Sequence, residues 1–230
     1  MFNHGWLDTR HSFSFAEYYD PRHMGFRQLR VINEDRVAGG AGFPPHPHQD
    51  MEIISYIVSG GLMHRDSTGS GSIVRAGEVQ RMTAGRGVIH SEFNASAVDP
   101  VHFLQIWITP DRQGLEPGYE QKTLDFDAAP DQWVPVVSGN GGRGAMKIHQ
   151  DVEIMATRLS PEATLDYPLG QGRHGWLQVV AGLVVVNGST ELTAGDGLSI
   201  SGEAGLTLTA GTPVPGHDSG KTEMLLFDLA

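Results

Sequence analysis

The sequence predicts an all-β protein with little helix, and three observations lead to this prediction. Its apolar and alternating runs are short and rich in Ile, Val and Leu, which is the pattern of strands with one or both faces buried. The chain of 230 residues contains 30 glycines and 13 prolines, which supply frequent turns between such runs. Helical periodicity is weak throughout. Many short strands separated by turns are typical of β-sandwiches and barrels.

Five runs are the clearest strand candidates. In chain order they are "EIISYIVSGG" (52–61), "HFLQIWITP" (102–110), "WLQVVAGLVVVNG" (176–188), "GLTLTAG" (205–211) and "EMLLFDL" (223–229). Glycine or proline bounds most of them. The best candidate for a helix is "TLDFDAAPDQW" (123–133), where Pro130 limits the helix to a short turn.

An internal repeat divides the chain into two similar β-domains. "YIVSGG" (56–61) resembles "QVVAGL" (178–183), and "RAGEVQRM" (75–82) resembles "TAGDGLSI" (193–200), in the same order. Glycine turns are common to all hairpin proteins, but two matches in one order favour a duplication. We expect the domains at residues 1–125 and 126–230, joined within the Pro- and Asp-containing stretch 110–132.

Composition excludes several classes of function. The chain has no cysteine, so disulfides, thiolate metal sites and cysteine nucleophiles are excluded, and any metal must bind nitrogen and oxygen. The formal net charge of −11 disfavours direct binding of nucleic acid. No secretion signal is visible, and no apolar run approaches the roughly 20 residues of a membrane helix. We therefore expect a soluble, cytoplasmic protein with no membrane partner.

Two short stretches carry paired side chains that suit a metal. In "HPHQDME", His46, His48 and Glu52 occupy even positions, and they project from one face if a single strand runs through them. In "HSE", His90 and Glu92 form a second pair at the same spacing. Two facing strands that carry these pairs bring imidazole and carboxylate groups together. Three histidines and a carboxylate at paired spacings predict a metal site rather than isolated structural histidines.

These stretches resemble the two cupin motifs. Residues 40–52 follow the first motif, G(x)5HxH(x)3–4E(x)6G, whose closing glycine falls one place late at Gly60. Residues 77–94 follow the second motif, G(x)5PxG(x)2H(x)3N, with Thr83 in place of proline and one or two extra residues before the histidine. Longer strings, including "NHGWLDTRHSFSFAEYYDPRHMGF", "HPHQDME", "AGRGVIHSEFN" and "LLFDL", are similar to the pirin family, and specifically to its bacterial members that resemble quercetin 2,3-dioxygenase. The similarity extends over essentially the whole chain.

The resemblance implies a bicupin, in which two cupin (double-stranded β-helix or jelly-roll) barrels follow one another. It implies that the N-terminal cupin holds one divalent transition metal, and it places the ligands on His46, His48, His90 and Glu92. In many other cupins the first-motif glutamate, here Glu52, is the ligand instead, so the choice of carboxylate stays open. Nitrogen and oxygen ligands favour iron(II), while copper, nickel, cobalt, manganese and zinc are compatible.

The implied activity is that of a mononuclear metal-dependent dioxygenase acting on quercetin. Such an enzyme cleaves the heterocyclic ring of a flavonol with O2 and releases carbon monoxide, and Glu92 or Glu52 would be the general base. The alternative is a non-enzymatic, redox-sensing pirin that regulates a protein partner. A cupin isomerase or decarboxylase would share the ligands but prefer a small polar pocket.

The second domain offers an internal comparison. Alignment of its glycine turns with those of the first domain predicts that the four ligand positions are occupied by Pro168, Gly170, Leu208 and Ala210, none of which binds metal. We therefore expect a C-terminal cupin without a metal site. Aromatic residues near the N-terminus suit either a ligand pocket or, more commonly, the core: they are Phe13, Phe15, Tyr18, Tyr19 and Phe26.

Overall fold

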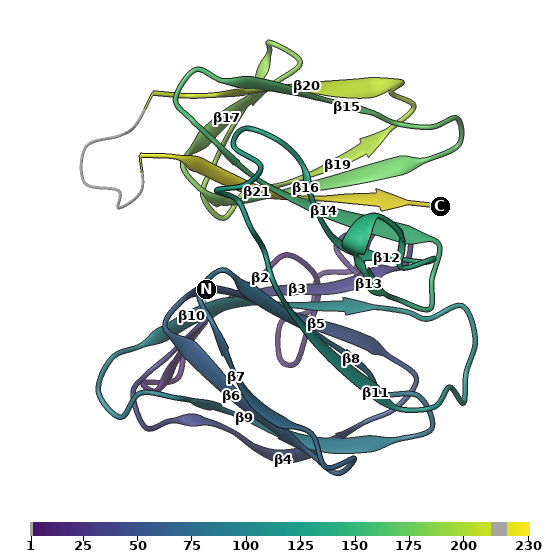
Figure 1. Cartoon of the computed structure of the whole chain (residues 1–230). Helices are drawn as coiled ribbons and strands as arrows, with labels where there is room; N and C mark the ends of the chain where they lie inside the picture. The colour runs from purple at the N-terminus through teal and green to yellow at the C-terminus, as the bar shows by residue number, and fades with distance from the viewer. Residues whose placement is uncertain (1, 213–219) are drawn as a thin grey trace. The chain divides into compact units, whose positions relative to one another are not determined.

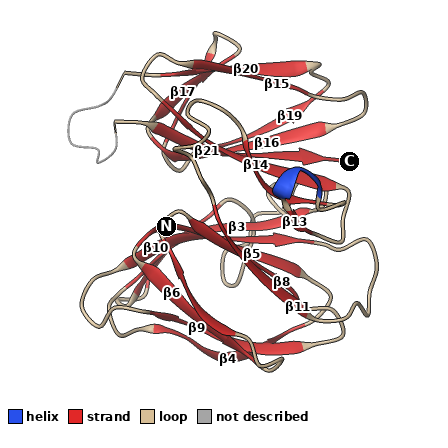
Figure 2. Cartoon of the chain, viewed as in Figure 1, coloured by secondary structure: helices blue, strands red, loops and turns tan. Residues whose placement is uncertain are grey.

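The computed structural model describes residues 2–212 and 220–230, and its regular secondary structure consists almost entirely of β-strands (Figures 1 and 2). The chain divides into two compact units. The first comprises Met1–Leu124 with Ile148–Gln150, and the second comprises Asp125–Lys147 with Asp151–Ala230. The all-β prediction is confirmed. A division into two domains at residue 125 remains a prediction.

The first unit consists of a seven-stranded and a four-stranded sheet (Figure 1). In spatial order, the larger sheet contains β1 (Phe2–Asn3), β2 (Leu7–His11), β3 (Leu29–Val37), β10 (Val101–Ile108), β5 (Glu52–Ser59), β8 (Glu78–Thr83) and β11 (Gly118–Thr123). The smaller sheet contains β4 (Gly42–His48), β9 (Val88–Asn94), β6 (Gly61–Asp66) and β7 (Gly71–Arg75). All the strand pairs of this unit are antiparallel.

The second unit repeats this arrangement with one strand fewer. Its six-stranded sheet contains β13 (Met146–Lys147), β12 (Val134–Ser138), β14 (Val152–Leu159), β21 (Thr222–Leu229), β16 (His174–Ala181) and β19 (Gly197–Ser201). Its four-stranded sheet contains β15 (Thr164–Pro168), β20 (Gly205–Ala210), β17 (Leu183–Val186) and β18 (Thr190–Thr193). The order of equivalent strands is the same in both units, which supports the internal repeat.

The repeated turns are equivalent in detail. Gly60 and Gly182 connect equivalent strands with φ values of 77° and 81°, a region that favours glycine. The amides of Ala76 and Ala194 each donate to the carbonyl of the respective glycine at 3.1 Å. These glycines therefore provide a common origin for comparing positions in the two units.

The expected helical turn at 123–133 does not form. β11 ends at Thr123, and the following residues make hydrogen-bonded turns. The amide of Ala128 donates to Asp125 Oδ1 at 2.9 Å, so an aspartate side chain fixes a turn here, and Pro130 cannot donate to a continuing helix. The helix that the structure contains within its described residues is a short 3₁₀ turn, Gly142–Gly144.

The two interiors differ in polarity. One end of the first interior is apolar and is formed by Leu7, Val37, Ile57, Leu62, Val74, Val101 and Phe103. Further along the same barrel, the buried side chains include Ser55, Gln80, Gln105 and Glu92. The second interior is filled by one large hydrophobic cluster. Among the described residues, no helix is long and apolar enough to cross a membrane.

Candidate metal centre

Three of the predicted metal ligands lie together in the first unit. β4 and β9 are adjacent antiparallel strands, and His46 lies directly opposite His90. The ring centroids of His46, His48 and His90 are separated by 4.5 to 4.8 Å. The strands are neighbours in one sheet, not facing strands as the sequence analysis expected. Their ligand atoms nevertheless converge closely enough to hold a metal ion.

The local sequence of β4 explains how its histidines reach β9. A bulge lies between Phe43 and His46, where two consecutive prolines cannot donate ladder hydrogen bonds. The bulge re-aims the following residues. At the start of β4 the two backbones approach so closely that a Cβ on Gly42 would lie 2.5 Å from the Glu92 carbonyl oxygen. Glycine at this position permits the strand pairing that brings the histidines together.

The protonation states of the histidines suit metal binding. His46 Nδ1 lies 2.8 Å from the carbonyl oxygen of Pro44, which can only accept, so Nδ1 carries the proton and the Nε2 lone pair is available. His46 Nε2 lies 3.0 Å from His90 Nε2. Burial lowers the pKa of His48 to about 4 and that of His90 to about 2. Neutral imidazole is the form that coordinates metals, so the donor set fits a transition metal.

Glu92 lies beside this cluster and is almost completely buried. Burial raises the pKa of its carboxyl group to about 7, although hydrogen bonds from the side chains of Gln105 and Gln80 oppose the shift. Its ligand atom lies within 4.8 Å of those of His90 and His64, so these three form a second group that could hold a metal. The two groups share His90. The structure therefore brings all four predicted ligands to one region but places Glu92 on the side of His90 that faces His64.

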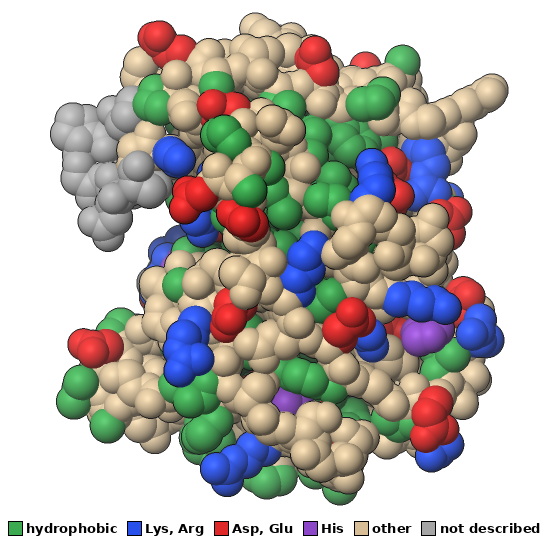
Figure 3. Space-filling view, in the orientation of Figure 1, with side chains coloured by type: hydrophobic (Ala, Val, Ile, Leu, Met, Phe, Trp, Pro, Cys, Tyr) green, Lys and Arg blue, Asp and Glu red, His purple; other side chains and the backbone are tan. Residues whose placement is uncertain are grey.

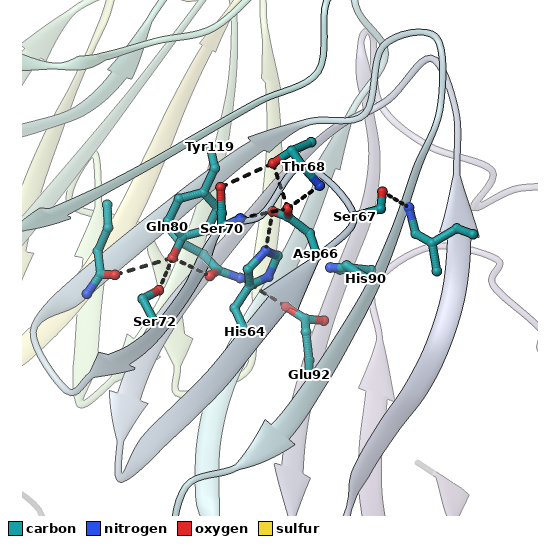
Figure 4. Close-up of polar contacts among 12 residues, drawn as sticks. His64, Asp66, Ser67, Thr68, Ser70, Ser72, Gln80, His90, Glu92 and Tyr119 are labelled. Atoms are coloured by element: carbon teal, nitrogen blue, oxygen red, sulfur yellow. Dashed lines mark hydrogen bonds and ion pairs between the residues drawn. The ribbon is translucent and has the colours of Figure 1, made fainter.

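The sequence analysis missed His64 and Asp66. His64 lies opposite Glu92 across the β6–β9 pair, and its Nε2 donates to Asp66 Oδ2 at 2.9 Å (Figure 4). Its ring stacks on Tyr119 with a centroid distance of 4.7 Å. The spacing of His64 and Asp66 in "HRD" was visible, but a single histidine without a second histidine nearby gave no reason to select it.

Glu52 does not reach the cluster. Its carboxylate is buried and accepts from Thr83 Oγ1 at 2.9 Å and lies 2.8 Å from His149 Nδ1. Ser55, three positions later on β5, contacts Glu92, so Glu52 points to the opposite face of that strand. The expectation that His46, His48 and Glu52 share one strand face is wrong. β4 ends at His48, and Asp50 with φ of 49° turns the chain into β5 of the other sheet.

Two hollows flank the histidine cluster. One, of about 350 Å³, is lined largely by aromatic and apolar side chains: Phe15, Tyr18, Tyr19, Met24, Met51 and Trp107. The other, of about 490 Å³, includes His48, Val88 and Ile89 in its lining. Trp107 joins the first hollow to the cluster, because its ring lies 4.9 Å from that of His48 and 5.3 Å from that of Phe15.

The predicted aromatic residues are thus divided between two environments. Phe15, Tyr18 and Tyr19 line the first hollow, whereas Phe13 is buried. Acidic and basic side chains are interspersed on the face drawn in Figure 3, and no broad basic surface is seen there.

The second unit lacks the ligands, but not at the residues predicted. Val186 lies four residues after Gly182, as His64 lies four residues after Gly60, and the residue opposite Val186 is Leu208. Leu208 is therefore equivalent to Glu92 rather than to His90. The alignment by sequence was displaced, because the turns between equivalent strands differ in length.

The remaining equivalences follow from the same register. They assign the positions of His46, His48, His90 and Glu92 to Tyr167, Leu169, Leu206 and Leu208, in place of the predicted Pro168, Gly170, Leu208 and Ala210. All four replacements belong to one buried hydrophobic cluster. The second unit has a core where the first has its histidines and carboxylate.

Comparison with known proteins gives matches along nearly the whole chain. Residues 1–108 match the family model described as pirin, and residues 135–229 match the quercetinase C-terminal cupin domain. A quercetin 2,3-dioxygenase of Escherichia coli K12 is 44% identical over 227 residues, covering 99% of this chain and 93% of the relative. A pirin-like protein of Caulobacter vibrioides is 41% identical, covering 90% of this chain and 89% of the relative.

Solved structures agree with these matches. YhhW from Escherichia coli superposes with a TM-score of 0.91 at 42% identity, covering 99% of this chain and 92% of that chain. The bacterial pirin YhhW in complex with nickel(II) gives a TM-score of 0.89 at 41% identity, covering 99% and 93% of the respective chains. Both cupin units and their order are thus shared with these relatives.

Proposed function

Because the chain belongs to the pirin family, we propose that its first cupin holds one divalent transition metal and cleaves flavonols with O2 in the manner of quercetin 2,3-dioxygenases. The proposed ligands are His46, His48, His90 and Glu92. The observation that carries the proposal is the convergence of three imidazoles from β4 and β9, two of them with strongly lowered pKa values, beside a buried carboxylate. Iron(II) is the metal that we propose for this nitrogen and oxygen donor set.

The residues around the centre have separate parts in the proposed reaction. The bound metal would supply Lewis acidity and would orient the reactants. We propose Glu92 Oε as the acceptor of the proton of the flavonol 3-hydroxyl group, because its carboxylate lies beside the histidines that would hold the metal. Glu52 is not proposed for this role, since its carboxylate is held by Thr83 and His149 on the other face of β5.

The lining of the first hollow supports an aromatic substrate. Its volume of about 350 Å³ lies within the usual range of small-molecule sites, roughly 300–1,000 Å³. Trp107 and Phe15 make an edge-to-face pair at its wall. A planar aromatic ligand can make stacked or edge-to-face contacts with these rings, and such contacts stabilise binding. A sugar or a small organic acid cannot make them. The proposed substrate is therefore a flavonol rather than a small polar molecule.

The test is reconstitution of the metal-free protein under anaerobic conditions. Iron(II), copper(II), nickel(II) or manganese(II) is added alone, followed by quercetin and O2, while flavonol loss and carbon monoxide release are measured. We expect turnover that depends on the metal and is lost in His90→Ala and Glu92→Ala. Stoichiometric metal binding without turnover for any of the four metals would refute the dioxygenase proposal. It would favour the redox-sensing alternative with a protein partner.

A further inference from the structure

A row of polar side chains crosses the inner face of the large sheet of the first unit. Five neighbouring strands contribute one residue each, and each residue lies opposite the next in the strand register. We call this set the amide row; its members, in spatial order, are Asn33, Gln105, Ser55, Gln80 and Gln121. Four of the five carry a carboxamide. The row lies where the carboxylate of Glu92 reaches across from β9.

Two amides of the row donate hydrogen bonds to the two oxygens of the Glu92 carboxylate. Gln105 Nε2 donates to Glu92 Oε2 at 2.7 Å, and Gln80 Nε2 donates to Glu92 Oε1 at 3.0 Å. Ser55 Oγ lies 3.1 Å from Glu92 Oε1. Each carboxylate oxygen therefore receives an N–H group, which fixes the rotation of the carboxylate about its own axis. Each oxygen retains lone-pair capacity for a further partner.

Other residues fix the orientation of these amides. Ser55 Oγ donates to Gln105 Oε1 at 2.8 Å, so the Nε2 end of Gln105 must face Glu92. The hydroxyl of Tyr119 donates to Gln80 Oε1 at 3.0 Å, which orients the second amide in the same way (Figure 4). An amide that flipped would set its carbonyl oxygen against a carboxylate. The chain thus contains an outer layer of hydrogen bonds that selects one arrangement.

The second unit provides an internal comparison. Positions are compared from the shared glycine turns: Leu177 precedes Gly182 by five residues, as Ser55 precedes Gly60. The register then identifies the row equivalent to Asn33, Gln105, Ser55 and Gln80 as Met155, Leu226, Leu177 and Leu198. Every one of these residues is apolar. The equivalent of Glu92 in this unit is Leu208, which lies in the same hydrophobic cluster.

In each unit, the residues of the row are therefore polar or apolar according to the side chain that projects onto them from the opposite sheet. Where a carboxylate projects onto the row, the row carries amides, and where leucine projects onto it, the row carries leucine and methionine. Burial of four polar side chains lowers the stability of the fold unless their donors and acceptors form hydrogen bonds. A general requirement of the cupin fold does not explain them, because the second unit has the same strand order without them.

We infer that the amides of Gln80 and Gln105 are positioning residues that hold the Glu92 carboxylate in the orientation required for metal binding. The inference rests on the proposed role of Glu92 as a ligand. Partners of this kind, one step removed from the metal, typically change metal affinity by 10–100-fold when they are removed. Tyr119 acts one step further out, through Gln80, and its hydroxyl has a smaller effect in the same direction.

The experiment measures binding of copper(II) alone to the full-length protein. Affinity is obtained by competition with a chelator, and the electron paramagnetic resonance spectrum of the copper(II) protein reports the coordination geometry. Gln80→Leu and Gln105→Leu install the residue type found in the equivalent row of the second unit. We expect the dissociation constant to rise about 10–100-fold in each, with altered copper hyperfine splitting.

Matched variants separate positioning from general damage. Asn33→Val removes an amide from the same row, but Asn33 makes no hydrogen bond with Glu92, and we expect wild-type affinity and spectrum. Tyr119→Phe keeps the ring that stacks on His64 and removes the hydroxyl alone, so it remains informative if a leucine variant fails to fold. We expect a smaller loss of affinity that disappears in the Gln80→Leu background.

The possible outcomes distinguish this inference from the proposed function. If Glu92→Ala weakens copper binding and changes the spectrum while both leucine variants match the wild type, the positioning inference is wrong and the ligand assignment stands. If Glu92→Ala itself leaves affinity and spectrum unchanged, the proposed metal role of Glu92 fails. A loss in Asn33→Val as large as in Gln105→Leu would show a general effect of the row on folding and would also overturn the inference.

Discussion

Replacement of Asp35 by asparagine should stabilise the metal-free protein at neutral pH. Asp35 lies on β3 inside the first unit, is 5% exposed, and its Oδ1 has no hydrogen-bond partner. Burial raises the pKa of this carboxyl group from 3.8 to about 6. Between these values the folded protein holds a proton that the unfolded chain has released. The contribution of Asp35 to stability is therefore most favourable below pH 4 and is lost as the pH rises through 6.

The pKa difference sets the size of the effect. A shift of about two units, at 1.36 kcal/mol per unit, corresponds to about 3 kcal/mol between the acidic and neutral ends of this range. Asp35→Asn keeps the shape of the side chain and removes the ionisation. We expect the variant to exceed the wild type in free energy of unfolding by about 2 to 3 kcal/mol at pH 7. The two proteins should converge as the pH falls to 4.

The assay is urea unfolding followed by tryptophan fluorescence at several pH values from 4 to 8. Low protein concentrations are needed because the isoelectric point of about 5.3 lies within this range. Glu203→Gln removes the same charge at an exposed position and should give a difference that is small at every pH. A difference between Asp35→Asn and wild type that does not change between pH 4 and 7, or a less stable variant at pH 7, would refute the reasoning.

Three further predictions test the site, the second core and one turn. His90→Ala should abolish stoichiometric metal binding with little change in thermal unfolding, and full metal content in this variant would contradict the ligand assignment. Leu208→Ala should lower the free energy of unfolding of the second unit by about 2–5 kcal/mol and leave metal content unchanged, because Leu208 is fully buried in a core that holds none of the proposed ligands. Gly85→Ala should lower the melting temperature, since φ is 48° and the added Cβ would overlap the carbonyl oxygen of Leu115. Gly69→Ala, with φ of 94° and open space around the added carbon, should cost less, and an equal cost would show that strain alone, without overlap, decides the effect.

Local periodicity was sufficient to place the side chains of β9. Strand residues alternate between two faces, so His90 and Glu92 at a spacing of two had to share a face. The same rule failed for Glu52 because it assumes that one strand continues. Asp50 interrupts the alternation with a positive φ, and the chain enters another sheet. Nothing in the spacing of "HPHQDME" distinguishes a continuous strand from two strands joined by a tight turn.

His64 and the amide row could not be found in this way, because their meaning depends on register between distant segments. His64 lies beside a proposed metal ligand only when β6 pairs with β9, and Gln105 contacts Glu92 only when the two sheets face each other. The local sequence around each of these residues gives no indication of a metal site. Glutamine in an apolar strand, as in "HFLQIWI", is nevertheless a usable indication, since a buried amide requires a partner.

The two units show why the buried carboxylate of Glu92 and the residues around it must change together. A buried carboxylate is tolerated when donors surround it, as Gln80 and Gln105 surround Glu92, and is costly when they are absent. Amides facing a leucine would be equally costly, because their own hydrogen bonds would be unmade. A carboxylate that faces an apolar row, or a leucine that faces a row of amides, is therefore less stable than a carboxylate with amides or a leucine with apolar residues. A unit that loses its carboxylate gains stability by replacing the amides as well, which is the combination found around Leu208.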